Sequence, residues 1–197
     1  MRYQTDHKEQ TRARVIAEAA KAIRTDGPHR IGVAAVMAKA GLTHGGFYAH
    51  FASKDDLVAA AIAQMFVEVA TRFEETVADK PPAEALRAYI DFYLSREHRD
   101  QRERGCPLPT LSADLPRLPL PARERYTLGV RRLTDRLCRH LAALGHAEPD
   151  RLAASTLAEL IGALVLARAV SEPDLSDSIL ANSKAMLKRR LGVEETA

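Results

Sequence analysis

The sequence is poor in the residues that indicate a disulfide framework, a zinc site or a membrane segment. It has no tryptophan, only two cysteines (Cys106 and Cys138), and 5% aromatic residues. Without a CxxC pair, the cysteines support neither a disulfide framework nor structural zinc, and we expect no metal or cofactor. No apolar run approaches the roughly 20 residues of a membrane span, and the N-terminus is polar, unlike a signal peptide. We therefore expect a cytoplasmic protein with no membrane partner.

Signatures of catalysis are also missing. The sequence contains no GxSxG, HExxH, P-loop or Rossmann glycine pattern, and its seven histidines are scattered. An enzyme would need a constellation of side chains that this pattern does not indicate. A catalytic function is therefore disfavoured.

The composition is that of a globular protein with a modest excess of positive charge. The chain has 197 residues, of which 46% are hydrophobic and 28% charged, enough for one larger domain or two small ones. A net charge of +3 and a pI near 9.0 are compatible with an anionic partner but do not require one. Several cations crowd the N-terminal segment, where a solvated helix face is the simpler interpretation: Lys8, Arg12, Arg14, Lys21, Arg24 and Arg30.

The apolar residues follow the helical period almost throughout the chain. No segment alternates with period two over the length of a strand, so the pattern predicts an all-α fold. Gly41 is expected to end a short helix in the left-handed conformation, and Ser53 with Asp56 to cap a helix of more than twenty residues. Prolines allow only short helical pieces between residues 95 and 121. The other expected helices start at a capping box of Asp6 and Glu9, at 33–40, after Pro82, near Tyr126, after Pro149 and near Ile179.

Residues 33–51 have the order of a helix-turn-helix, in which the second helix enters the DNA major groove. Phe47 and Phe51 are spaced to anchor this second helix in the core. Gly45 and Gly46 each cost a helix roughly 1 kcal/mol relative to alanine, and they allow the backbone to approach a duplex closely. A simple loop is the alternative interpretation of the paired glycines.

The remaining side chains of this segment suit contacts to phosphates and bases. Thr43 can cap the helix or donate to a phosphate, Tyr48 offers a ring and a hydroxyl, and His44 and His50 can donate to backbone oxygens. Lys54 lies in the first turn of the next helix, where a cation is unfavourable unless an anion sits in front of it. The predicted DNA-binding residues are Thr43, His44, Gly45, Gly46, Tyr48, His50 and Lys54.

This stretch resembles the DNA-binding domain of the tetracycline-repressor (TetR) family. Between about Ala17 and Leu57, the sequence "AGLTHGGFYAHFASKDDL" is similar to the family's A-G-V-x-x-G-x-x-Y-x-H-F-x-S-K-x-x-L core. Gly32 stands where the family often has serine or threonine, which leaves no side-chain phosphate contact at that point. The motif positions occupied are Gly41, Gly45, Tyr48, His50, Phe51, Lys54 and Leu57.

The resemblance implies a three-helix DNA-binding head with a helix-turn-helix at residues 1–52 and a helical ligand-binding and dimerisation domain at 53–197. It also implies a homodimer on double-stranded, near-palindromic operator DNA. Residues 157–170, "LAELIGALVLARAV", are apolar nearly all round and need partners on two sides. We expect the dimer to form through the last two helices, with the core helix of a monomer as the alternative.

Regulators of this family typically release DNA when a small-molecule inducer enters the C-terminal domain. The scarcity of charge on the expected lining indicates a modest, largely apolar ligand, although most lining candidates also suit an ordinary core. Cys106 follows two arginines and precedes Pro107 at an expected helix start, where a thiolate is stabilised, so it is a candidate electrophile or oxidant sensor or else an inert thiol. The predicted ligand-binding residues are Phe66, Tyr89, Tyr93, Cys106, Leu111, Tyr126, Leu133 and Leu137.

Two other functions remain open beside an inducible repressor and the disfavoured enzyme. The same head could belong to an architectural or helical interaction protein that does not release DNA. It could also serve an activator, since promoter geometry decides whether bound protein blocks or recruits polymerase. Inducible release of DNA separates the first alternative from a repressor.

Overall fold

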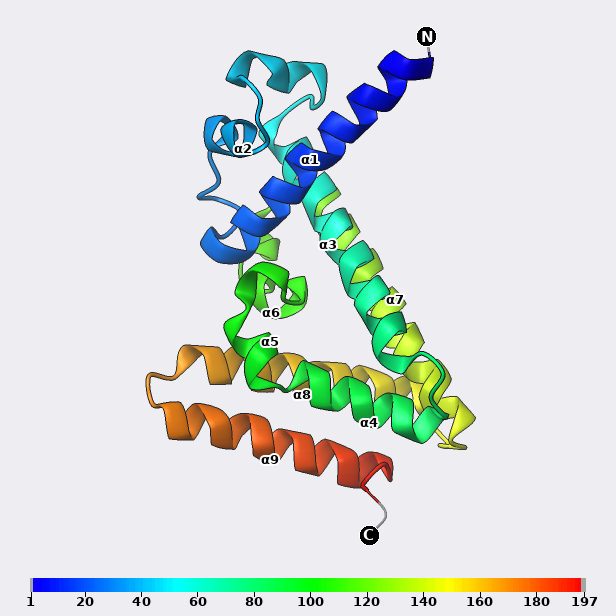
Figure 1. Ribbon diagram of the computed structural model, residues 1–197. Helices are drawn as coiled ribbons and strands as arrows, with labels where there is room; N and C mark the ends of the chain where they lie inside the picture. Colours follow the sequence, from blue (N-terminus) through cyan, green and yellow to red (C-terminus); the bar gives the residue numbers. More distant parts are fainter. Residues whose placement is uncertain (1, 196–197) are drawn as a thin grey trace. The chain divides into compact units, whose positions relative to one another are not determined.

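The computed structural model describes residues 2–195, with side chains from His7 onward, and every regular element among these residues is helical (Figure 1). The predicted all-α fold is therefore confirmed. The elements are α1 (Arg2–Asp26), α2 (Val33–Lys39), η1 (His44–Ala49), α3 (Lys54–Val77), α4 (Pro82–Tyr93), α5 (Arg96–Asp100), η2 (Arg102–Arg104), α6 (Pro107–Leu111), η3 (Leu115–Arg117), α7 (Leu120–Ala143), α8 (Pro149–Ala169) and α9 (Pro173–Leu191).

The helix ends agree with most of the sequence signals. Gly41 has φ 75°, the left-handed conformation predicted for the end of α2. At the start of α3 the Asp56 amide donates to Ser53 Oγ at 3.1 Å, and Asp56 Oδ2 accepts the Ala52 amide at 3.2 Å. The predicted cap of α3 is thus confirmed. The start predicted for α1 is wrong, because α1 begins at Arg2 and Asp6 lies inside it.

The chain forms two compact units, and α3 and α7 each contribute to both. Unit 1 comprises Met1–Glu68 with Cys106–Leu128, and unit 2 comprises Val69–Gly105 with Gly129–Ala197. This division concerns packing alone. The functional boundary predicted between residues 52 and 53 stays a prediction.

The core of unit 1 joins the N-terminal helices to the segment around α6. Leu111 and Leu115 are buried in one cluster with Val15 and Ile23 of α1 and Ile62 of α3. A five-residue helix such as α6 is unstable in isolation, so its conformation depends on this burial. The apolar cluster, and not local propensity, holds α6 in place.

Arg24 departs from the solvated face expected for the N-terminal cations. Its side chain is 2% exposed, and Nη2 contacts Glu68 Oε2 at 2.6 Å, which ties α1 to α3 within unit 1. Removing Glu68 would take a carboxylate acceptor away from this buried cation and should be destabilising. Arg24 is therefore part of the structural core.

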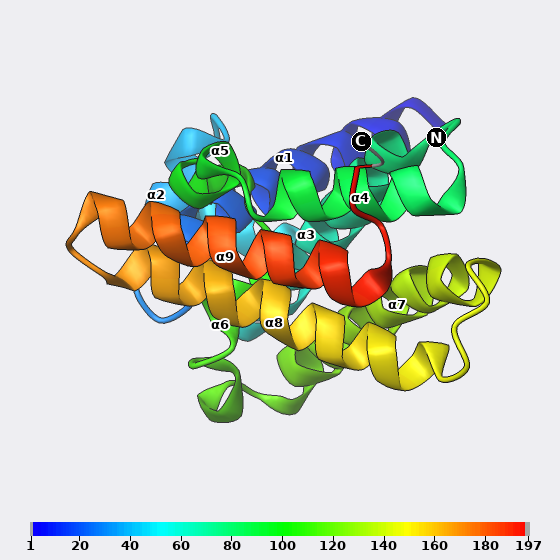
Figure 2. The same ribbon diagram turned by 90° about the horizontal axis from the view of Figure 1, so that it is seen from below.

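Unit 2 is built on α8 and α9, which run antiparallel side by side, with α4 packed against both (Figures 1 and 2). One face of each helix of the pair is buried, with Leu160 and Leu164 on α8 and Leu180 and Leu187 on α9. By length and composition α8 could cross a membrane, with a mean hydropathy of 1.6 over its most apolar stretch, although no such run was expected. Core helices of soluble proteins share this composition, so it is weak evidence for a membrane span.

His98 is a buried polar residue in unit 2. Its ring stacks on Phe92 at 5.2 Å and 17°, and Nδ1 lies 2.8 Å from the Tyr93 carbonyl oxygen. Burial, only partly offset by this hydrogen bond, lowers the pKa of His98 to about 4. The folded protein therefore holds His98 neutral at neutral pH and in mild acid.

This burial predicts a specific loss of stability in mild acid. Well above pH 6.5 His98 is neutral in both states and its contribution is fully present; as the pH falls through 6.5 toward 4, only the unfolded chain takes up the proton. Between these limits the wild type should lose about 3 kcal/mol of unfolding free energy through this one group. In His98→Gln the dependence on pH, measured by urea unfolding from pH 6.5 to 4.5, should be correspondingly flatter. If the unfolding free energy of both proteins fell equally with pH, the loss of stability could not be assigned to His98.

Candidate nucleic-acid interface

The second element of the helix-turn-helix is a 3-10 helix, η1, and not the α-helix that the pattern suggested. The Gly46 amide donates to the Thr43 carbonyl at 3.1 Å and the His50 amide to the Phe47 carbonyl at 2.9 Å, both three residues back. Paired glycines lower the α-helical propensity of this segment, and short elements often adopt the tighter helix. The six residues of η1 still follow α2 as the second helical element of the helix-turn-helix.

Two aromatic rings hold η1 on the core, as predicted. Phe47 and Phe51 are each 2% exposed and stack at 5.5 Å. The guanidinium of Arg12, from α1, lies 4.9 Å from the Phe51 ring centre. These contacts fix which side of η1 faces outward.

Three of the predicted DNA-binding side chains are exposed at η1 and its N-cap. Tyr48 is 74% exposed, and Thr43 and His44 are exposed as well. Thr43 occupies the N-cap position, but its hydroxyl makes no capping hydrogen bond, so that part of the prediction is wrong. These three side chains are therefore accessible to a binding partner, and the Tyr48 ring offers a large exposed area.

The two glycines of η1 are not required by internal packing. A Cβ on Gly45 would meet no atom within 4 Å, and one on Gly46 would make only an ordinary contact with Met37. Neither glycine has a positive φ. A bare backbone at an exposed position is what close approach to another molecule requires.

Lys54 begins α3 as predicted and also ties it to the turn before α2. Its Nζ donates to the His29 carbonyl oxygen at 3.1 Å, and the side chain is half-buried. This hydrogen bond explains the lysine in the first turn without an anion. A phosphate contact from Lys54 stays a prediction.

His50 lies where cations of α1 meet η1. Its Nδ1 is buried and has no hydrogen-bond partner among the described residues. Burial, followed by the charges of Lys8 and Arg12, lowers the pKa of His50. The sequence does not assign Lys8 and Arg12 to this surface, because a helical period alone does not show which face of α1 meets η1.

The predicted ligand-binding residues fall into two groups. In unit 1, the Phe66 and Tyr126 rings meet edge to face at 5.8 Å, and the Tyr126 hydroxyl lies 2.8 Å from Ser112 Oγ. Leu111 is fully buried and Cys106 is 4% exposed, at the N-cap of α6 before Pro107. Burial first, and the nearby Cys106 charge in addition, raise the pKa of Tyr126, although Ser112 lowers it.

The other four candidates lie in unit 2 and are buried. Tyr89 and Tyr93 have ring centres 5.8 Å apart, and Leu133 and Leu137 are inside the same unit. Phe73, which was not among the predicted ligand-binding residues, lies closer to Tyr89, with ring centres 4.5 Å apart and planes tilted by 56°. It lies on the apolar stripe of α3, and that stripe alone does not separate core residues from ligand contacts.

Neither of two open cavities described in unit 2 is lined by these residues. One, of about 520 Å³, lies along Ser95, Arg96 and Lys184, and one of about 410 Å³ along Arg102 and Arg168. Among the residues that the structure describes, no three His, Cys, Asp or Glu side chains gather as metal ligands.

The comparisons with known proteins cover most of the chain. Residues 15–61 match the family of bacterial regulatory proteins called the tetR family, and residues 82–182 match the tetracyclin repressor-like C-terminal domain. No curated protein sequence matches the chain.

Solved structures resemble the chain along most of its length. E. coli NemR in its reduced form has a TM-score of 0.80 at 22% identity, covering 91% of this chain and 97% of NemR. A TetR transcriptional regulator from Chloroflexus aurantiacus has a TM-score of 0.80 at 24% identity, and the match covers 95% of this chain and 96% of that regulator. A TetR-family regulator from Agrobacterium tumefaciens has a TM-score of 0.78 at 24% identity, and the match covers 92% of this chain and 98% of that regulator. At these identities the likeness is one of fold.

The exposure of Tyr48 predicts a variant that separates binding from folding. Tyr48→Ala should weaken binding to a specific duplex about tenfold or more, since one base contact contributes roughly 1–3 kcal/mol. Its thermal unfolding midpoint should not change, because the ring is 74% exposed. Phe47→Ala is the contrasting variant and should lose about 3–5 kcal/mol of stability. Fluorescence anisotropy and thermal melts measure both; unchanged affinity in Tyr48→Ala would refute the assigned surface.

Proposed function

This chain belongs to the tetR family of bacterial regulatory proteins, DNA-binding transcription regulators that are not enzymes, and we propose that it is a cytoplasmic repressor. It binds a palindromic operator as a homodimer and leaves the DNA when a small apolar or electrophilic inducer binds. The observation that carries this proposal is the surface of η1, where Tyr48 and the bare backbone at Gly45 face outward from an anchored element.

The charge around η1 supports contact with a polyanion. Lys8 and Arg12 act electrostatically on His50, and Lys54 lies at the start of α3. Cations of this kind position a protein on phosphates and carry no sequence information, whereas Tyr48 and His44 can reach base edges. Binding should therefore combine a salt-dependent part with a sequence-specific part.

The outer faces of α8 and α9 support the proposed dimer. On α8, Ala158, Val165 and Leu166 are exposed on the side of Gly162, and the latter two are 38% and 56% exposed. On α9 the exposed residues Leu175 and Met186 fall on one helical stripe with Ile179 and Asn182. Because α8 and α9 lie side by side, the two stripes suit a self-complementary contact. Two heads on successive major grooves would then read half-sites about 34–36 Å apart or a multiple of that.

The packing of α6 supports a route from the inducer to the DNA-binding elements. Cys106 precedes α6, and Leu111 of α6 is buried in the cluster that includes Val15 and Ile23 of α1. A ligand or an adduct that moves α6 must therefore disturb the core beneath α1. One structural relative, E. coli NemR, is known in a reduced form, which makes the thiols of this chain a sensible target.

Cys106 is the thiol we propose for an electrophile response. It is 4% exposed, so an adduct requires α6 to open and could not be accommodated without movement. Cys138 is partly exposed, and the hydrogen bond to Asp150, at 2.9 Å, raises its pKa. The raised pKa makes Cys138 a poor nucleophile at neutral pH.

The test is binding of the protein to a duplex from immediately upstream of its own gene. We expect specific binding relative to a scrambled duplex, and a severalfold or greater loss of affinity after N-ethylmaleimide treatment, read by fluorescence anisotropy. Cys106→Ser should bind as well as the wild type and ignore the electrophile; Cys138→Ser is the matched control and should keep the response.

The other outcomes separate the alternatives. Specific binding that the electrophile leaves unchanged would refute the thiol response and direct the search to apolar ligands. Binding of every duplex with equal affinity would favour the architectural alternative. A rise in transcription from the bound promoter would favour an activator.

Gly162→Arg tests the dimer surface directly. An added side chain there meets no atom within 4 Å of its Cβ, so the subunit should fold normally, and a glycine is lost from a helix interior. In a dimer, however, the new charge would be forced into the contact and should dissociate it. Ala181→Arg, an exposed change on α9 off the stripe, should stay dimeric. Sedimentation velocity reads both, and a dimeric Gly162→Arg would place the contact elsewhere.

A further inference from the structure

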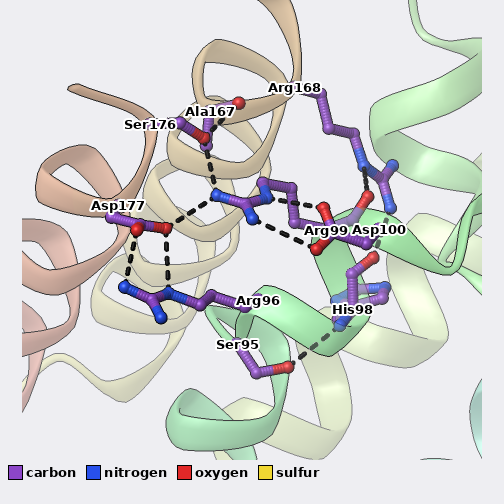
Figure 3. A network of polar contacts seen from close by, with 9 residues as sticks. All are labelled: Ser95, Arg96, His98, Arg99, Asp100, Ala167, Arg168, Ser176 and Asp177. Atoms are coloured by element: carbon purple, nitrogen blue, oxygen red, sulfur yellow. Dashed lines mark hydrogen bonds and ion pairs between the residues drawn. The ribbon is translucent and has the colours of Figure 1, made fainter. Parts of the chain in front are cut away.

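The short helix α5 is attached to the end of the α8–α9 pair by a dense network of charges (Figure 3). It has only five residues, so it cannot persist on its own helical propensity. Ser95 Oγ accepts the His98 amide at 3.0 Å and caps its start. The other contacts that hold α5 come from α8, from α9 and from the end of α4.

Asp177 of α9 is the centre of the attachment. Arg96 donates to both of its carboxylate oxygens, from Nε to Oδ1 at 3.0 Å and from Nη2 to Oδ2 at 2.6 Å. Arg99 Nη1 donates to Asp177 Oδ1 at 2.8 Å and to Ser176 Oγ at 2.9 Å. Paired bonds between arginine and carboxylate combine strength with a defined orientation. Figure 3 shows Asp177 held between the two arginines.

The opposite end of α5 is held by α8. Arg168 donates from Nη2 to the His98 carbonyl at 2.6 Å and from Nε to the Arg99 carbonyl at 3.1 Å, which satisfies carbonyls at the C-terminal end of α5. Ser176 Oγ in turn donates to the Ala167 carbonyl of α8 at 2.6 Å. The corner where α8 passes into α9 is thus bonded to α5 from both helices.

The position of α5 in the chain connects this corner to the proposed inducer region. On one side, His98 stacks on Phe92 and meets Tyr93 edge to face at 4.8 Å, both at the end of α4. On the other side, a Cβ on Gly105 would lie 3.0 Å from Arg168 Nη2, and Cys106 is the next residue. Movement at either side of α5 therefore acts on the network around Asp177 and Arg168.

The network also touches the stripe assigned to the dimer. Leu175 and Ile179, at the start of that stripe, lie two residues on either side of Asp177 on α9. A displacement of the first turn of α9 would misplace Leu175 first. We propose that α5 is a latch that sets the position of the α9 N-terminal turn through Asp177, so that changes in α4 or the 101–106 segment reach the dimer contact. This inference rests on the proposed dimer of α8 and α9.

Linkage makes the latch testable without knowledge of the inducer. If α5 and dimerisation are coupled, association must protect the amides of α5, and loosening α5 must weaken association by the same factor. The variant Asp177→Asn keeps the shape and removes the charge on which the bonds from Arg96 and Arg99 depend. Asp174→Asn, in the exposed first turn of α9, removes the same charge outside the network and is the matched control.

The measurements are hydrogen exchange of the peptide containing α5 and sedimentation equilibrium of the full chain, each over a range of protein concentrations. In the wild type and Asp174→Asn, exchange at residues 96–100 should slow as the dimer forms. In Asp177→Asn, that exchange should be faster, should no longer respond to dimerisation, and the dimer dissociation constant should rise about tenfold.

The failures are distinguishable. A dimer whose α5 exchange ignores association, or identical behaviour of the two asparagine variants, would overturn the latch and leave the proposed dimer standing. A wild type that remains monomeric at all concentrations would overturn the proposed dimer and, with it, the coupling to α5.

Discussion

Burial of α6 and η3 against α1 and α3 is the contact on which the organisation of this protein depends. Through it the segment Cys106–Leu128 belongs to the same compact unit as the helix-turn-helix, although residues 69–105 separate the two in the sequence. Because interiors are close-packed, side chains such as Leu111 cannot shift without displacing their neighbours on α1.

Arginine side chains also join separate helices, at places where polar groups are buried. Arg24 joins α1 to α3 through Glu68, and Arg168 joins α8 to the carbonyls of α5. Both side chains use a planar, always charged group with several donors, which a lysine could not replace at such sites. The excess of positive charge in this chain is therefore divided between structural connections and the surface near η1. Net charge alone does not separate the two uses.

The element with the least favourable helix propensity is η1, the second element of the helix-turn-helix. The paired glycines give η1 a weak helical tendency, and the structure shows a 3-10 helix whose place is fixed by Phe47, Phe51 and the cation of Arg12. An element held by its neighbours and bare at Gly45 is suited to lie against a duplex. The buried core residues keep η1 in place, and its exposed side chains are the groups available to contact DNA.

The sequence by itself determined the local features: the helical period, the left-handed Gly41, the cap formed by Ser53 and Asp56, and the motif from Gly41 to Leu57. These depend on neighbouring residues, so periodicity and spacing suffice to predict them. Only the tertiary structure decided that Arg24 is buried, that Lys8 and Arg12 face His50, and that α5 is bonded to α8 and α9. Those features join residues tens of positions apart, and a helical pattern shows which face is apolar but not which helix it meets. The division of the predicted ligand residues between two compact units has the same cause.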